Sequence, residues 1–176
     1  MWWRAPKASA ILLNGSIVYL YDSFVKLTQS HEKAAEEWLL MSQRAGRALV
    51  NEMFNLIVMM ASKSIEDVTF IIDFAWYIFL NQKPISIKYI PPDEEGVAKI
   101  IWNWDNCIIC TDAQHILDPE IVKIHHLGWL VSGVFGTAIQ MIQDYVGNSY
   151  RIEVEDTKSQ ARGDPYCEAP AYFYPI

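Results

Sequence analysis

The sequence predicts an α+β fold in which helices pack on an antiparallel sheet, in the order helices, β-hairpin, long helix, β-hairpin. Two observations predict it. Apolar residues recur at helical spacing over residues 32–61, and they alternate at strand spacing over residues 97–104 and 167–173. No repeat, linker or low-complexity segment divides the 176 residues. A single domain covering residues 1–176 is therefore expected.

The first half of the chain is predicted to be mainly helical. Residues 8–13 favour a short strand, with a helix after it that runs towards His31. Residues 32–61 have the period of one long amphipathic helix. Ser64 belongs to a capping signal for a third helix over residues 65–81, which is apolar nearly all round. That third helix is expected to be central.

Two hairpins are predicted in the second half. Residues 85–90 and 97–104 form two strands around a Pro- and Gly-containing turn, and Trp102 and Trp104 fall on the same face of the second strand. The other hairpin pairs residues 150–154 with the terminal strand, in which Cys167, Ala169, Ala171 and Phe173 share one face. Both faces are expected to point towards the core or a pocket.

A long helix is predicted between the hairpins. Asp118 followed by proline is a strong helix start, and Gly147 is suited to the position just after the helix end. Gly128, Ser132 and Gly136 recur every four residues along it. Such a strip of small residues lets a sheet, a helix or a dimer partner approach closely.

The composition restricts the class of partner. The net charge is −7, and no run of Lys and Arg offers an electrostatic footprint for nucleic acid or anionic lipid. Hydrophobic residues make up 52% of the chain, including seven Trp, nine Tyr and seven Phe. The apolar runs are shorter than the ~20 residues of a membrane span, and the first residues lack a secretory apolar core. We expect a cytoplasmic protein with an apolar small-molecule partner.

Aromatic residues are the candidate ligand-binding set. Trp76, Tyr77, Trp102 and Trp104 lie on the predicted central helix and the second strand, where they line either a ligand pocket or a well-filled core. No nucleophile motif, phosphate-binding glycine loop or zinc-protease motif occurs in the sequence. An enzyme is therefore not the leading interpretation, and no catalytic residue is assigned.

Cysteines and histidines are the candidate metal ligands. Cys107 and Cys110 form a Cys-x-x-Cys pair after the second strand, and Cys167, His125 and His126 supply further soft ligands. Such a set suits tetrahedral zinc, and three cysteines favour metal binding over a disulfide framework in a reducing compartment. Neighbouring helical residues point about 100° apart. Only one of the two histidines can therefore face the site.

Three segments carry a resemblance to a known family. They are Trp-Asp-Asn-Cys at residues 104–107, Gly-Trp-Leu-Val-Ser-Gly at 128–133, and the ending Gly-Asp-Pro-Tyr-Cys at 163–167. The chain resembles the 4-vinyl-reductase superfamily, which includes archaeal hydrocarbon-binding proteins. It is also similar to the aromatic-effector sensor domains of phenol- and xylene-responsive regulators and to trafficking subunits of the TRAPP type.

The resemblance implies a zinc held by a helix cysteine and by a hairpin that carries an acid and two cysteines. By position, Asp156 matches the acid, Cys167 the last cysteine and Trp104 a pocket tryptophan. The sequence departs from the pattern at Ser159, where a cysteine is usual, and at His125–His126, near the usual helix cysteine. Either the site is rebuilt from the cysteines and histidines above, or the metal has been lost.

The leading functional hypothesis is a domain that binds or senses an apolar, aromatic or hydrocarbon molecule, with a structural zinc and a homodimer built on the long helices. One alternative is an enzyme or enzyme accessory of tetrapyrrole or hydrocarbon metabolism. Another is a protein-interaction adaptor of the trafficking-subunit type. A closed metal site beside an apolar cavity would favour the sensor. A solid core with an exposed apolar patch would favour the adaptor.

Overall fold

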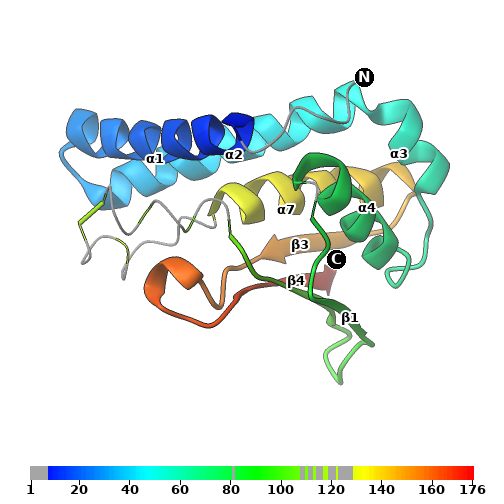
Figure 1. Ribbon diagram of the computed structural model, residues 1–176. Helices are drawn as coiled ribbons and strands as arrows, with labels where there is room; N and C mark the ends of the chain where they lie inside the picture. Colours follow the sequence, from blue (N-terminus) through cyan, green and yellow to red (C-terminus); the bar gives the residue numbers. More distant parts are fainter. Residues whose placement is uncertain are drawn as a thin grey trace.

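The chain forms a helical layer and a four-stranded sheet, as predicted (Figure 1). The computed structural model describes residues 8–80, 82–107, 110, 113, 117, 118, 122 and 129–176. Its elements, in order, are α1 (Ala8–Thr28), α2 (His31–Glu52), α3 (Phe54–Met60), α4 (Val68–Leu80), β1 (Ser86–Ile90), β2 (Ala98–Trp104), α7 (Trp129–Tyr145), β3 (Tyr150–Val154), the 3-10 turn η2 (Gln160–Arg162) and β4 (Cys167–Pro175). The α+β class and the order of helices and hairpins are confirmed.

All neighbouring strands of the sheet are antiparallel, in the order β1-β2-β4-β3. In the β2–β4 pair, Trp102 lies opposite Ala169 and Trp104 lies opposite Cys167. Burial alternates along the whole of β2, and the buried residues of β4 include Cys167, Ala169, Ala171 and Phe173. The predicted faces are therefore the faces that the sheet turns towards the core.

Helices cover one side of the sheet (Figure 1). The antiparallel pair α1 and α2 lies farthest from the strands, and α7 lies between this pair and the sheet. Helices α2 and α7 approach closely because both carry glycine at the contact. A Cβ added to Gly46 would lie 2.6 Å from the Val134 carbonyl oxygen, and one added to Gly133 would lie 2.5 Å from Cβ of Ser42.

The long helix ends as the sequence predicts. Gly147 has φ +78, and its N–H donates to the Asp144 carbonyl while the Asn148 N–H donates to the Gln143 carbonyl. This pair of bonds is a Schellman motif. A Cβ on Gly136 would meet Val154 of β3 at 3.3 Å, so this residue of the predicted small-residue strip packs against the sheet. Gly128 lies outside the described residues.

Two predictions for the first half were wrong. Residues 8–13 belong to helix α1, because Val18 and Tyr21 are buried at helical spacing while Phe24 and Val25 pack against the same core. The predicted helix over residues 32–61 is two helices. It breaks at Met53, whose backbone (φ −101, ψ 11) leaves the helical region and serves as the end of α2 and the start of α3.

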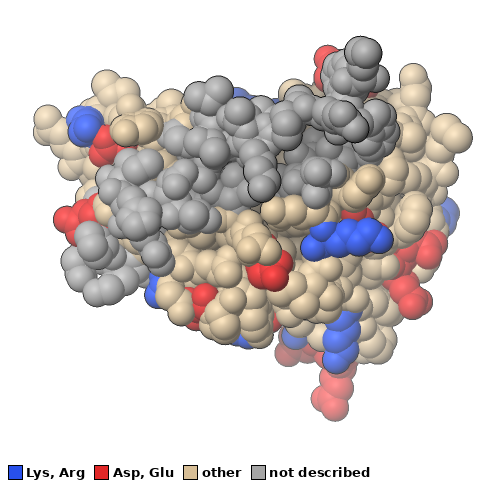
Figure 2. All heavy atoms as spheres, viewed as in Figure 1, with Lys and Arg blue, Asp and Glu red and all other residues tan. Residues whose placement is uncertain are grey.

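On the face drawn in Figure 2, the basic and acidic side chains of the described residues are interspersed. Within the described part of the chain, every helix is either too short or too polar to cross a bilayer.

Candidate functional site

An apolar cavity lies among helices α2, α3, α4 and α7. Its volume is about 50 Å³, and it is partly open to solvent. The lining residues are Leu49, Val50, Met53, Ile57, Met60, Ile71, Ile72, Phe74, Ala75, Val134, Phe135, Ala138, Ile139 and Ile142. Every one of these side chains is apolar. The cavity therefore offers shape and dispersion contacts to a ligand and, from these side chains, no hydrogen bond.

The four aromatic residues singled out from the sequence lie elsewhere. Trp76 and Trp102 are fully buried, Trp104 is nearly so, and Tyr77 is 42% exposed on α4. The Trp76 ring lies 5.1 Å from the Phe135 ring, centroid to centroid, and the Trp102 ring lies 6.0 Å from it. Phe135 is itself part of the cavity wall. The two tryptophans thus form an aromatic layer directly behind that wall.

This aromatic layer contains unpaired donors. The indole Nε1 atoms of Trp76 and Trp102 are buried and have no hydrogen-bond partner. A buried N–H without an acceptor costs roughly 1–3 kcal/mol, and native proteins keep few of them. An acceptor brought in by a ligand would remove that cost, provided that the Phe135 ring moved aside.

A second candidate site is a cluster of three buried cysteines. Cys107, Cys110 and Cys167 are 7%, 6% and 2% exposed, and their sulfur atoms all lie within 4.8 Å of one another. Cys107 and Cys110 form a disulfide, whereas Cys167 is a free thiol. Metal binding was expected in preference to a disulfide at this pair. The structure brings the three predicted ligands together but joins two of them covalently.

The surroundings of the cluster are polar and directed at sulfur. The Cys110 N–H donates to Cys107 Sγ and the Gln160 N–H donates to Cys167 Sγ, both at 3.3 Å. Ser159 is buried, with its hydroxyl 3.7 Å from Cys110 Sγ. Ser159 thus lies at the cluster. Burial nevertheless raises the pKa of the Cys167 thiol to about 11.

Asp156 is a buried acid near this cluster. Its side chain is 8% exposed, and its Oδ2 atom has no hydrogen-bond partner. Burial raises the pKa of Asp156 to about 7, although a hydrogen bond with Ser132 of α7 and the charge of Arg162 act in the opposite direction. Its negative charge also contributes to the raised pKa of Cys167. An unpaired buried carboxyl oxygen beside thiols is suited to a proton or a cation.

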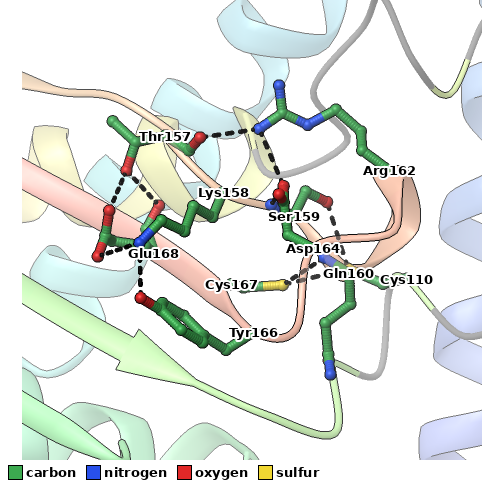
Figure 3. A network of polar contacts seen from close by, with 10 residues as sticks. All are labelled: Cys110, Thr157, Lys158, Ser159, Gln160, Arg162, Asp164, Tyr166, Cys167 and Glu168. Atoms are coloured by element: carbon green, nitrogen blue, oxygen red, sulfur yellow. Dashed lines mark hydrogen bonds and ion pairs between the residues drawn. The ribbon is translucent and has the colours of Figure 1, made fainter.

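The Gly-Asp-Pro-Tyr-Cys ending shapes the connection between β3 and β4 (Figure 3). Gly163 adopts φ +96, a left-handed conformation that favours glycine. The Asp164 carboxylate accepts a hydrogen bond from the Ser159 N–H at 2.8 Å, and the Asp164 N–H donates to the Ser159 carbonyl at 3.2 Å. Gln160 links this β3–β4 connection to the turn after β2, because its Oε1 accepts a hydrogen bond from the Cys107 N–H at 2.9 Å.

The outer side of the same connection carries charged contacts (Figure 3). The Lys158 ammonium donates to the Tyr166 hydroxyl at 2.6 Å and to Glu168 at 3.3 Å. Thr157 donates to the same Glu168 carboxylate at 2.8 Å. These groups hold the two strand ends together around the free thiol of Cys167.

Some candidates lie outside the described residues, and some site residues were missed. His125 and His126, the predicted histidine ligands, fall outside the described part of the chain. The cavity wall was missed, because Ile57, Ala138 and Phe135 were not singled out. Their apolar helical periodicity was the available signal, and it indicates burial without indicating an empty space.

Comparisons with known proteins give the fold. No family model and no curated protein matches the chain. A trafficking protein particle complex subunit 3 from Naegleria fowleri, solved covalently bound to palmitic acid, is similar with a TM-score of 0.71 and 18% identity, over 97% of this chain and 99% of that one. The phenol-responsive sensory domain of the transcription activator PoxR, solved with phenol, is similar with a TM-score of 0.57 and 13% identity, over 93% and 74%.

These likenesses support the relation in fold to TRAPP subunits and to phenol sensors. At such identities they concern the fold and not the activity. The assignment to the 4-vinyl-reductase superfamily itself stays a prediction.

Proposed function

We propose that this domain binds an apolar small molecule in the cavity among α2, α3, α4 and α7. The observation that carries the proposal is the uniform lining, in which all fourteen side chains are apolar. Burial of hydrocarbon contributes about 0.8 kcal/mol per methylene group, so a purely apolar cavity supports binding without polar contacts. Both similar structures were solved with an apolar or aromatic molecule, palmitic acid in one and phenol in the other.

A hydrocarbon chain suits this cavity better than a phenol does. A hydroxyl buried among these side chains would lose its hydrogen bonds to water and gain none from the wall, at a cost of a few kcal/mol. A chain-like ligand can leave its polar end in the solvent-open part of the cavity. No cysteine is among the described lining residues, so we propose non-covalent binding.

The aromatic layer offers a second mode for ring-shaped ligands. We propose that Trp76 and Trp102 serve such a ligand through their unpaired Nε1 donors, with Trp104 and Tyr77 as further contacts. The Trp76 and Trp104 rings already pack at 4.8 Å. This mode requires movement of Phe135, and binding of a chain requires the cavity to widen, for which the flexible side chains of Met53 and Met60 in its wall are suited.

The test compares two probes that share one hydroxyl group, dodecanol and phenol, by isothermal titration calorimetry. We expect dodecanol to bind at least tenfold more tightly. Ala138→Phe, which fills the cavity, should abolish that binding. Ala48→Phe makes the same change on the exposed face of α2 and should preserve it. Tighter binding of phenol, lost in Trp102→Phe, would favour the aromatic mode. Absence of binding by both probes would refute the ligand-binding function.

We also propose that the three cysteines, when reduced, hold a structural zinc with His125 or His126. Three cysteine sulfurs that lie within 4.8 Å of one another fit a cation site. Ser159→Cys adds a thiol beside Cys110 and should tighten zinc binding, measured by competition with a chromogenic chelator. Ser64→Cys, at an exposed position, is the control. Equal affinities in the two variants would contradict a site at this cluster.

An adaptor function is the alternative, and a specific observation favours it. Helix α3 is apolar except for Asn55, yet none of its residues is buried. Met59 is 84% exposed, and Leu27 of α1 is 79% exposed. Such side chains suit a homodimer or another protein partner. Native mass spectrometry at micromolar concentration would detect a dimer, and Leu27→Lys should then dissociate it if α1 forms the interface.

A further inference from the structure

The three sulfur atoms can be used in two mutually exclusive ways. In the described state Cys107 and Cys110 are joined, and Cys167 remains a thiol 3.5 Å from Cys110 Sγ. A zinc centre needs all three as thiolates. We infer that the Cys107–Cys110 disulfide and the zinc centre are alternative states of one redox-sensitive site, so that oxidation of the pair releases the metal. This inference rests on the zinc site proposed above.

The cluster is arranged to accept either state with little rearrangement. Backbone N–H groups already point at Cys107 Sγ and Cys167 Sγ. Hydrogen bonds of this kind are stronger when the acceptor is ionised, so they favour thiolates as metal ligands. They are already present in the disulfide state. Reduction therefore exposes a set of ligands whose supporting donors are in position.

The step balances with a peroxide as the oxidant. The Cys107 and Cys110 thiolates together lose two electrons and form the S–S bond. The O–O bond of hydrogen peroxide accepts the electron pair, breaks, and leaves as two water molecules after uptake of two protons. Zinc keeps its oxidation state throughout. It departs because Cys167 is then the last thiolate of the three. A dithiol reductant reverses the sulfur chemistry and restores the site.

The burial of Cys107 and Cys110 limits the size of an oxidant that can reach them. Cys107 and Cys110 are 7% and 6% exposed, which admits a small peroxide and disfavours a bulky disulfide. The state of the pair also reaches the β3–β4 connection, because Gln160 accepts a hydrogen bond from the Cys107 N–H and donates its own N–H to Cys167. Figure 3 shows Gln160 and Cys167 on this connection, close to Cys110.

The alternative disulfide, Cys110–Cys167, can be distinguished by peptide mapping. Trypsin cuts after Lys99, Lys123 and Arg162. A Cys107–Cys110 disulfide therefore stays within the peptide 100–123. A Cys110–Cys167 disulfide would join that peptide to the peptide 163–176. The two products differ in mass before and after reduction.

The experiment starts from the full chain, reduced, loaded with zinc and freed of excess metal. Hydrogen peroxide is added in steps, released zinc is measured with a chromogenic chelator, and disulfides are measured by intact and peptide mass. We expect about one zinc ion released per disulfide formed within residues 100–123, and recovery of zinc binding after reduction. Cys167→Ser should weaken zinc binding and still form the disulfide. Cys107→Ser should form no disulfide within that peptide. Circular dichroism checks that each variant is folded.

The outcomes separate the two proposals. If the reduced chain binds no zinc, the zinc site and its redox control both fail. If zinc binds but stays bound after the Cys107–Cys110 disulfide forms, the zinc site stands and the redox control is wrong. If oxidation joins the peptides 100–123 and 163–176, the assignment of the redox pair is overturned. None of these results depends on the ligand of the apolar cavity.

Discussion

The apolar cavity and the thiol cluster are built by opposite means, and helix α7 lines the first and reaches the second through the hydrogen bond between Ser132 and Asp156. The cavity wall is made of side chains without a polar atom, among them Met53 and Met60, which adapt readily to different shapes. The thiol cluster is surrounded by directed hydrogen bonds, in which the N–H groups of Cys107 and Ser159 donate to side-chain oxygens and Cys167 Sγ accepts from an N–H. The cavity depends on the shape of its wall and should tolerate apolar substitutions. The thiol cluster depends on the geometry of individual hydrogen bonds and should tolerate fewer changes.

The largest expected effect is the pH dependence of the thiol region. The pKa of Asp156 is raised from 3.8 to about 7 in the folded chain, so folding favours its protonated form. This stabilisation is present below about pH 4 and is lost as the pH rises through about 7, for a total of up to roughly 4 kcal/mol. Urea unfolding with a chelator present should show this decline, and Asp156→Asn should lack it.

The cavity provides the contrast in the same pH range. No titratable group is among its described lining residues. The affinity for dodecanol should therefore stay constant between about pH 5 and about pH 8. If the free energy of unfolding changed with pH in the same way in the wild type and in Asp156→Asn, burial of Asp156 would not be the cause of the pH dependence. A dodecanol affinity that follows the Asp156 titration would show that the two regions are coupled.

The second effect tests helix α7, which contacts both regions. Gly46→Val places side-chain atoms against the Val134 backbone of α7, where an added Cβ would already lie 2.6 Å from the carbonyl oxygen. We expect a loss of about 3 kcal/mol in the free energy of unfolding, with weaker binding of both dodecanol and zinc. Gly136→Ala is the milder control, since its Cβ would meet Val154 at 3.3 Å. Equal stability of the two variants would refute the close helix contact.

A third effect separates the regions. Gly163→Ala and Gly147→Ala each place a side chain at a positive φ, +96 and +78, with no atom within 4 Å of the new Cβ. Both should cost about 1 kcal/mol. Zinc affinity should fall in Gly163→Ala alone, because that residue shapes the connection beside Cys167. A similar loss in Gly147→Ala would indicate that the zinc effect is only general destabilisation.

The smallest effect is expected in the cavity wall. Met60→Leu nearly conserves volume, so the free energy of unfolding should change by less than about 1.5 kcal/mol. Dodecanol affinity should change by only a few-fold. A much larger loss of affinity, measured by calorimetry, would mean that the cavity is as specific in shape as the thiol cluster is in geometry.

Strands and the helix end were the parts of the fold that sequence could predict. Alternation placed Trp102 and Trp104 on one buried face, and Gly147 marked the end of α7. Both signals are local. The helix break at Met53 carries no proline or glycine, and α1 was misread because its first residues are apolar without a clear period. Propensity and pattern do not resolve such segments, because tertiary packing decides them.

The candidate sites were predictable to different degrees. Cys107, Cys110 and Cys167 were singled out because cysteine is rare and its spacing is informative. The cavity was not found, because residues as distant as Leu49 and Ile142 enclose it together. Periodicity indicates which face of a helix is buried, but an unfilled space depends on how four helices meet. The ligand-binding residues predicted from the sequence were aromatic, and they form the layer behind Phe135 instead of lining the cavity.

The weakly held helix at the cavity has a consequence for the rate of ligand exchange. Helix α3 contributes Ile57 and Met60 to the wall, although none of its residues is buried. Local opening is easiest where few apolar contacts must be broken. We expect the amide hydrogens of α3 to exchange with solvent faster than those of α7. The residence time of a bound hydrocarbon would then be set by the opening frequency of α3 and not by the affinity of the wall alone.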